Sequence, residues 1–157
     1  GLEVGKPGNE TTAFRLIHGE ADFLPGLIVD AYGEFLVIQV LSLGLAQRLP
    51  ELVTVLAETV KPAGIYQRSD VEVREREGLP QETGVLWGQS PPDRLRIREH
   101  GLDFLADVKK GQKTGFFLDQ RKNRRALRRA DRETYRAADR SRTARQGDAG
   151  RPQWLLC

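Results

Sequence analysis

Three runs rich in β-branched and aromatic residues follow one another near the start of the chain, and they constrain its fold more than any other feature. The runs read AFRLIHG, PGLIVDAYG and FLVIQVLSL, and they begin at Ala13, Pro25 and Phe35. Such runs, broken by glycine-containing turns, are typical of β-strands. The second and third runs meet at Tyr32-Gly33, so they predict a β-hairpin.

A helix is predicted after these strands. Apolar residues recur there at spacings of three or four and form one stripe; they are Leu45, Leu49, Leu52, Leu56 and Val60. The helix should end at Lys61-Pro62 and hold Pro50 in its first turn or at a kink, because proline lacks an N–H. GIYQRSD and TGVLWG predict further strands. The run VEVREREG between them predicts a polar helical turn or loop with a solvated, ion-paired face.

A second hairpin is predicted from Arg94 to Val108, with His100-Gly101 at its tip, because apolar residues alternate on both arms. The stretch KKGQKTG then predicts a loop, and Asp119 can cap a helix that includes at least residues 120–129. No Val, Ile or Phe follows Phe117, so residues 128–157 are expected to be a frayed helix end and a disordered tail. The fold class is therefore α+β.

Charge is distributed unevenly along the sequence. Residues 1–118 carry 13 basic and 17 acidic side chains, a net −4, whereas residues 119–157 carry 12 basic and 5 acidic side chains, a net +7. A basic end indicates contact with nucleic acid, but a solvated tail has the same composition. The single cysteine and the lack of a long apolar run indicate a cytoplasmic protein that has neither disulfides nor contact with membranes.

Two familiar kinds of site are excluded by spacing. A phosphate-binding P-loop would need glycines at positions 107 and 112, where Asp107 and Gln112 stand. His18 and His100 have no cysteine or carboxylate at metal-ligand spacing, so no metal is expected.

The stretch GQKTGFF, from Gly111 to Phe117, combines groups that a solvent loop does not need. Glycines let backbone N–H groups approach an anion, an aromatic face favours a cation, and the carboxylate of Asp119 can accept from an ammonium. S-adenosylmethionine carries a carboxylate, an ammonium and a sulfonium. The mixture would therefore suit this cofactor, although Phe116 and Phe117 could equally be core residues.

Three segments together carry a resemblance to a known family: the run from Thr11 to Val40, then GIYQRSDVEVREREGLP, then the run from Arg96 to Leu127. They closely resemble the bacterial ribosomal RNA large-subunit methyltransferase I family, whose members are S-adenosylmethionine-dependent 23S rRNA 5-methylcytosine methyltransferases. The family's architecture is an RNA-binding PUA domain, a small central α+β domain and a Rossmann-like methyltransferase domain.

The resemblance implies a linker at residues 1–10, the central strand-helix-strand domain at 11–92, and the start of the methyltransferase domain at 93–127, followed by the tail at 128–157. It places S-adenosylmethionine against the loop. The residues implied to line or support that site are Gln112, Lys113, Thr114, Gly115, Phe116, Phe117, Asp119, Gln120 and Arg121. The implied partner is 23S ribosomal RNA; a homodimer is possible, and the sequence leaves it open.

The sequence also departs from the family. After Leu127 no V-L-D-x-x-x-x-x-G-G motif follows to cradle the cofactor, and Cys157 lies in no matching context for a catalytic thiolate. We therefore expect a truncated or frameshifted member that is inactive by itself.

Two other readings stay open at this stage. The chain could be a non-catalytic RNA-binding accessory module that uses the arginine-rich segment at 121–145, or a piece without independent function. In the first case the contacts with RNA phosphates would come from Arg124, Arg125, Arg128 and Arg129, which could also be the exposed side of a surface helix.

Overall fold

The computed structural model describes residues 10–131 and 133. The chain divides into two compact units, one ending at Leu118 and the other beginning at Asp119. The predicted linker, apart from Glu10, and most of the predicted tail lie outside the described residues.

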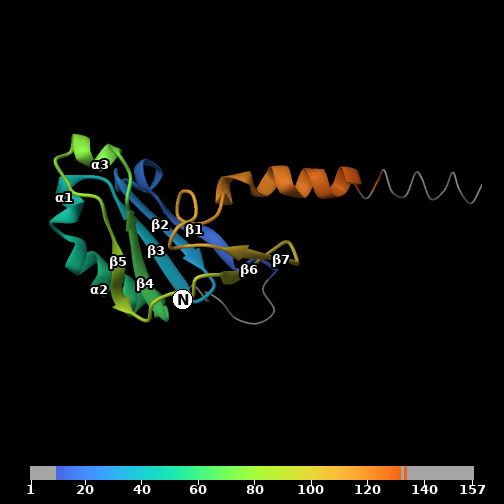
Figure 1. Ribbon diagram of the computed structural model, residues 1–157, viewed down its shortest axis with the longest axis horizontal. Helices are drawn as coiled ribbons and strands as arrows, with labels where there is room; N and C mark the ends of the chain where they lie inside the picture. Colours follow the sequence, from blue (N-terminus) through green and yellow to red (C-terminus); the bar gives the residue numbers. More distant parts are fainter. Residues whose placement is uncertain (1–9, 132, 134–157) are drawn as a thin grey trace, which may run out of the picture. The chain divides into compact units, whose positions relative to one another are not determined.

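The first unit is built on a mixed sheet. Within the described part of the chain the sheet has five strands in the order β1-β2-β3-β4-β5 (Figure 1). Their bounds are β1 Ala13–His18, β2 Leu27–Tyr32, β3 Phe35–Val40, β4 Gly64–Ser69 and β5 Glu82–Gly88. Only β3 and β4 pair in parallel, because the helix between them carries the chain back to the same end of the sheet. The predicted α+β class is confirmed.

The remaining elements of the first unit connect or cover the strands. They are the 3-10 helix Gly19–Asp22, the helices α1 Leu43–Ala46, α2 Leu49–Val60 and α3 Val73–Arg76, and the strands β6 Leu95–Glu99 and β7 Leu102–Ala106. A second 3-10 helix, Leu118–Gln120, precedes a helix over residues 121–131.

Local sequence explains the β2–β3 hairpin and helix α2. Gly33 adopts a φ of 57° at the first position of the two-residue turn between Tyr32 and Phe35, a conformation that favours glycine. Helix α2 holds Pro50 in its first turn and ends at Lys61, whose left-handed backbone donates its N–H to the carbonyl of Ala57. The hairpin, the place of Pro50 and the end of the helix are confirmed. The single stripe from Leu45 to Val60 is wrong in part, because the helix is interrupted after Ala46 and Leu45 lies in α1, not in α2.

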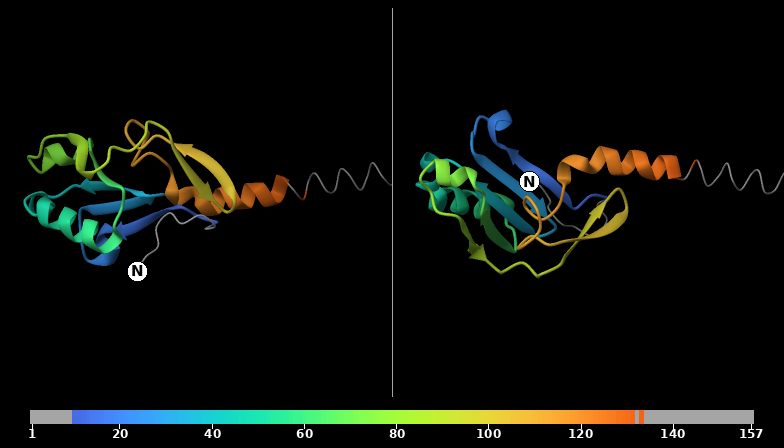
Figure 2. Two further views of the ribbon diagram at one scale, coloured as in Figure 1. Left: turned by 90° about the horizontal axis from the view of Figure 1, so that it is seen from below. Right: turned by 45° about the horizontal axis from the view of Figure 1, so that its top comes forward.

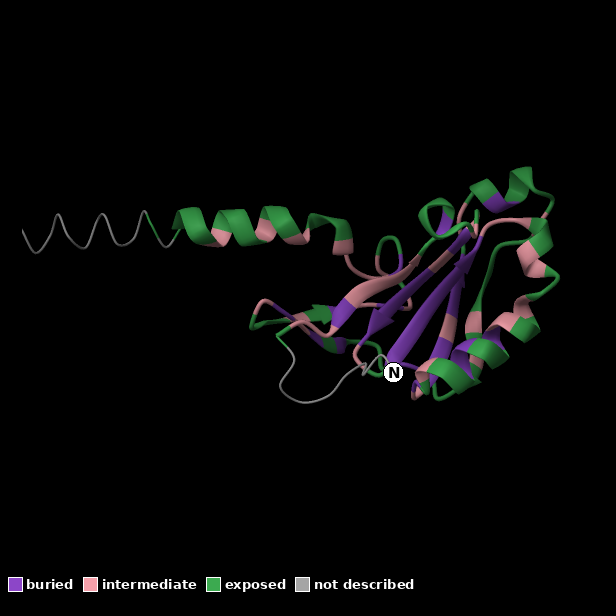
Figure 3. Cartoon of the chain, turned by 180° about the vertical axis from the view of Figure 1, so that it is seen from behind, coloured by how far each residue is buried: buried purple, intermediate pink, exposed green. Residues whose placement is uncertain are grey.

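The central strands of the sheet, β2, β3 and β4, are buried on both faces (Figures 2 and 3). Leu36 and Ile38 of β3 pack with α2 in one cluster, whereas the alternate residue Val37 packs with Leu95 and Ile97 of the β6–β7 hairpin in the other. Because successive side chains of a strand point to opposite faces, a strand covered on both sides reads as a continuous apolar run. This explains the sequence FLVIQV in β3.

One prediction about charge is wrong in part. Arg74, in the run VEVREREG, does not lie on a solvated face: its side chain is 1% exposed. Its guanidinium donates to the carbonyls of Val40 and Pro80, at 2.6 and 2.8 Å, and to the carboxylate of Glu82 at 3.0 Å. Arg76 of the same helix is exposed, as predicted.

Candidate functional site

The candidate site is the loop between β7 and the 3-10 helix at Leu118, which we call the 107–117 loop. Asp107 organises its start, because its carboxylate accepts from the backbone N–H groups of Lys109 and Lys110, at 3.2 and 2.8 Å. The Asp107 carbonyl accepts from the N–H of Gly111 at 2.9 Å. A second turn follows, in which the N–H of Gly115 donates to the carbonyl of Gln112 at 2.9 Å. The loop is therefore folded by its own backbone.

Both glycines are required by close approach of the backbone. A Cβ on Gly111 would lie 2.4 Å from the carbonyl oxygen of Asp107, and a Cβ on Gly115 would lie 2.7 Å from that oxygen and from the Cα of Val108. Gly115 also has a φ of 121°, a backbone conformation that residues with a Cβ rarely adopt. Lys113 has a φ of 56°, so its backbone is left-handed. We call the exposed pair Gln112 and Lys113 the crest of the loop.

Arg68 of β4 holds the first half of the loop on the sheet. Its Nη1 donates to the carbonyl of Val108 and its Nη2 to the carbonyl of Gly111, each at 2.9 Å. The guanidinium is 5% exposed, and its Nε donates to the carboxylate of Asp70 at 2.9 Å. Partial burial acts to raise the pKa of Asp70, but hydrogen bonds from Arg68 and from its own backbone N–H outweigh it, so the pKa is lowered.

Asp30 and Tyr32 of β2 hold the second half. The hydroxyl of Thr114 donates to the carboxylate of Asp30 at 2.5 Å and lies 2.8 Å from the hydroxyl of Tyr32. The Tyr32 hydroxyl also lies 3.4 Å from the carbonyl of Phe116. Asp30 is fully buried and is paired with the guanidinium of Arg15 at 2.8 Å. Burial raises the pKa of Tyr32 to about 12, so this hydroxyl stays protonated and can donate.

The two adjacent phenylalanines have different environments. Phe116 packs into the cluster under the β6–β7 hairpin, with its ring centroid 5.4 Å from that of Phe104. Phe117 is 38% exposed, and the ammonium of Lys113 lies 5.0 Å from its ring centroid. The first phenylalanine is therefore a core residue, and the second is presented at the surface with a cation beside it.

The predicted site residues thus fall into three groups. Thr114 is buried, Gly115 and Phe116 are half-buried, and all three take part in folding the loop or holding it to the sheet. Gln112, Lys113 and Phe117 are exposed on the loop. The remaining predicted residues, Asp119, Gln120 and Arg121, belong to the second unit.

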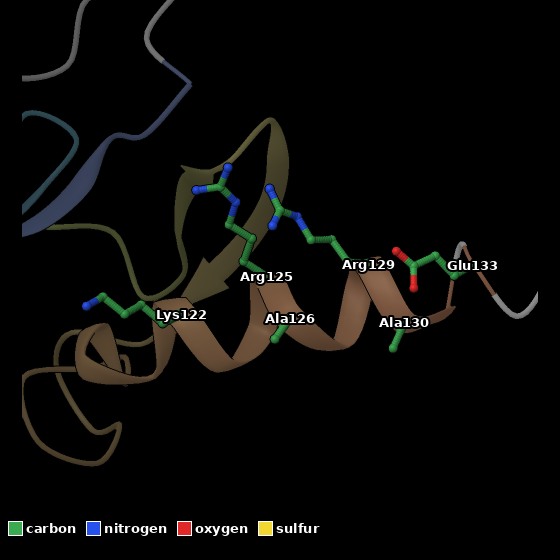
Figure 4. Close-up of a pocket in the computed structure, with 6 residues that line it drawn as sticks. All are labelled: Lys122, Arg125, Ala126, Arg129, Ala130 and Glu133. Carbon is green, nitrogen blue, oxygen red and sulfur yellow. The ribbon is translucent and has the colours of Figure 1, made fainter.

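The second unit contains the helix over residues 121–131, which bears the predicted RNA-binding arginines. Arg125 and Arg129 are exposed, and in Figure 4 their side chains extend in the same direction from successive turns. An open hollow of about 400 Å³ is lined by these two arginines together with Lys122, Ala126, Ala130 and Glu133. The other two arginines, Arg124 and Arg128, are half-buried.

Sequence reasoning missed the residues that hold the loop: Asp30, Tyr32 and Arg68. The available signal was a charged residue inside an apolar strand, as in LIVDAY and GIYQRS. A charge in such a position has to be paired or hydrogen-bonded when the strand is buried. The sequence could not show which residue pairs with Asp30, because its partner Thr114 is 84 residues away in the chain.

Neither a metal-binding cluster nor a membrane-spanning helix occurs among the residues that the structure describes. No group of three or more histidine, cysteine, aspartate or glutamate side chains within that range could hold a metal ion. Over the same residues, no helix has the length and apolar character needed to cross a membrane.

Comparison with known proteins gives relatives at high identity over part of their length. The protein named Ribosomal RNA large subunit methyltransferase I of Cronobacter sakazakii is 49% identical over 117 residues, which are 74% of this chain and 30% of that protein. Its counterpart in Escherichia coli O127:H6 is 46% identical over 117 residues, with the same coverage. The chain thus spans about 30% of the length of the curated relatives it matches. No protein-family model matches the sequence.

Two solved structures resemble this chain. One is described as "A putative sam-dependent methyltransferase from Streptococcus mutans"; it matches with a TM-score of 0.64 and 28% identity, over 75% of this chain and 29% of that chain. The other is described as a putative methyltransferase complexed with SAH; it matches with a TM-score of 0.62 and 28% identity, over 73% of this chain and 28% of the other.

Proposed function

Because this chain belongs, as a partial member, to the ribosomal RNA large subunit methyltransferase I family, we propose that its 107–117 loop forms one wall of an S-adenosylmethionine site. The observation that carries the proposal is the loop itself, which the sheet holds firmly while it presents Gln112, Lys113 and Phe117 at the surface. The bound cofactor supplies the methyl group for transfer to ribosomal RNA.

The exposed groups fit the chemistry of that cofactor. The ammonium of Lys113 can pair with a carboxylate, the amide of Gln112 can donate or accept a hydrogen bond, and the ring of Phe117 can pack against an adenine or a sulfonium. A cofactor with both charges of an amino acid and a flat base would use all three. The less exposed residues of the loop support this wall; they are Thr114, Gly115 and Phe116. The loop is followed in the chain by Asp119, Gln120 and Arg121.

We also propose the domain organisation that goes with this function. Residues 11–92 form a central domain, and residues 93–127 begin a Rossmann-like methyltransferase domain whose cofactor loop is docked on that central domain. The substrate is the cytosine C5 position of 23S ribosomal RNA, in the cytoplasm.

The 157-residue polypeptide is expected not to transfer methyl groups by itself. Its sequence contains no V-L-D-x-x-x-x-x-G-G motif for the opposite side of the cofactor, and no cysteine in a context suited to attack C6 of cytosine. Incubating it with labelled S-adenosylmethionine and unmodified 23S rRNA, beside a full-length relative as positive control, should give no incorporation. Turnover above the protein-free background would contradict the proposal.

A second candidate function is RNA binding by the helix over residues 121–131. It is favoured by the density of basic side chains there, namely Arg121, Lys122, Arg124, Arg125, Arg128 and Arg129. Successive turns of one helix hold these charges about 5–6 Å apart, a spacing that can follow the phosphates of an RNA strand. This function can accompany the first or stand without it.

Replacing Arg124, Arg125, Arg128 and Arg129 together with glutamine is expected to weaken RNA binding and to flatten its dependence on salt. If each arginine contacts one phosphate, the slope of log K against log salt should fall by roughly 3. The measurement is fluorescence anisotropy with a labelled RNA over a range of salt concentrations. A control that replaces Arg96 and Arg98, both paired with Asp103, should leave the slope nearly unchanged. Equal slopes in the wild type and the fourfold variant would exclude this helix as the binding surface.

A further inference from the structure

We infer that Arg68 and Asp30, two residues of the central sheet, are positioning residues that set the conformation of the 107–117 loop. The inference rests on the proposed function for what the loop binds. It adds that the sheet, through these two side chains, holds the loop ready for the cofactor.

Arg68 is suited to this role by its hydrogen bonds and its burial. Each of its three nitrogens donates once, to Asp70, to Val108 and to Gly111. Two of these acceptors are backbone carbonyls of the loop, and both belong to the turn in which the Asp107 carbonyl accepts from the N–H of Gly111. A guanidinium presents its donors in a rigid planar fork, so it fixes the spacing between two carbonyls as a lysine could not.

Asp30 fixes the second turn of the loop, which is closed by Gly115 and Gln112, through the side chain of Thr114. Its carboxylate is fully buried and accepts from the Thr114 hydroxyl on one side and from Arg15 on the other. Tyr32 supports the same hydroxyl at 2.8 Å. Arg68 therefore holds Gly111, and Asp30 holds Thr114, by hydrogen bonds. Only the exposed pair Gln112 and Lys113 lies between these two held residues.

The loop therefore consists of residues that hydrogen bonds hold to the sheet and residues whose side chains are exposed. The crest carries the side chains that face solvent, and its backbone is held on both sides by bonds to different strands, β4 and β2. Holding a binding loop in one conformation before the ligand arrives reduces the entropy that binding must overcome. Loss of either anchor should therefore loosen the crest while the strands stay paired.

The test is amide hydrogen exchange of the whole 157-residue chain, comparing Arg68→Ala with Arg74→Ala. Arg74 is a matched control, because it too is a buried arginine that donates to two backbone carbonyls, but neither belongs to the loop. In the Arg68 variant the amides of Lys110, Gly111 and Gly115 should exchange roughly ten- to a hundredfold faster relative to those of β2 and β3. In the Arg74 variant the loss of global stability should speed exchange of the strand amides at least as much as that of the loop amides, so the loop-to-strand ratio should not rise.

Thr114→Val gives a second test with a smaller perturbation, because it removes only the hydroxyl that Asp30 accepts from. It should accelerate exchange at Gly115 more than at Lys110, which lies nearer the Arg68 anchor. The inference is overturned if the loop-to-strand ratio of exchange rates rises in neither Arg68→Ala nor Thr114→Val, or if Arg74→Ala raises this ratio as much as Arg68→Ala does.

A separate titration with S-adenosylhomocysteine distinguishes failure of this inference from failure of the proposed function. If exchange in the loop is selectively faster in Arg68→Ala but S-adenosylhomocysteine does not bind, the role of Arg68 and Asp30 stands and the proposed cofactor site is wrong. Binding that is equally strong in the wild type and Arg68→Ala would keep the cofactor and overturn the role of Arg68.

Discussion

Replacing Arg74 with alanine is expected to lower the free energy of unfolding by about 3–5 kcal/mol, the largest effect of any single charge removal proposed for this chain. The guanidinium is 1% exposed and donates at 2.6 Å to the carbonyl of Val40 and at 2.8 Å to that of Pro80. Its loss would leave both carbonyls without this donor. The carboxylate of Glu82 is 50% exposed, so water would replace the arginine there at little cost.

Urea denaturation monitored by circular dichroism measures this effect. Arg76→Ala is the control, because Arg76 lies two residues away on the same short helix and is exposed; it should change stability by less than about 0.5 kcal/mol. If the two variants had similar midpoints, the buried position of Arg74 would be wrong, and the run VEVREREG would be the solvated face that its sequence predicts.

Replacing Gly115 with alanine is expected to detach the 107–117 loop from the sheet. The added Cβ would meet only backbone atoms, at 2.7 Å from the Asp107 oxygen and the Val108 Cα, and a φ of 121° is strained for alanine. The combined cost is on the order of 2–5 kcal/mol, comparable with the net contribution of the hydrogen bonds from Arg68 and to Asp30 that hold the loop. The loop should open, and the sheet should remain.

Limited proteolysis with trypsin reports on this opening, because Lys113 lies at the crest. Cleavage after Lys113 should be at least about tenfold faster in Gly115→Ala than in the wild type. Gly44→Ala is the control, since a Cβ there meets nothing within 4 Å and the glycine lies in α1 without a positive φ. Unchanged cleavage at Lys113 in Gly115→Ala would show that the loop tolerates a side chain and is not built as described.

Sequence patterns predicted the local elements of this fold well. The β2–β3 hairpin, helix α2 with its proline in the first turn, and the β6–β7 hairpin all follow from features a few residues apart, such as a turn glycine or an apolar stripe. The sheet order could not be predicted in the same way. The local patterns do not say which strands pair or in which direction; in the structure the five strands lie in chain order, and β3 and β4 are parallel.

The site shows the same division between local and distant information. The glycines and aromatic residues of GQKTGFF predicted a loop with a defined conformation. The geometry explains why positions 111 and 115 need glycine, because the backbone approaches both too closely for a Cβ. Which phenylalanine is buried depends on Phe104, a residue of β7, so adjacent letters in the sequence could not separate Phe116 from Phe117. The same holds for Arg68 and Arg74, since a charge within a short run is solvated or buried according to carbonyls far away in the chain.

The central claim is that the crest of the 107–117 loop contacts the cofactor. The most direct measurement is titration of the ¹⁵N-labelled chain with S-adenosylhomocysteine, followed by two-dimensional NMR of the backbone amides. The account predicts saturable shifts centred on Gln112, Lys113 and Phe117, with a roughly millimolar dissociation constant because one wall of the site acts alone. Shifts centred elsewhere in the chain, or none in this loop at ligand concentrations of about ten times that value, would contradict it.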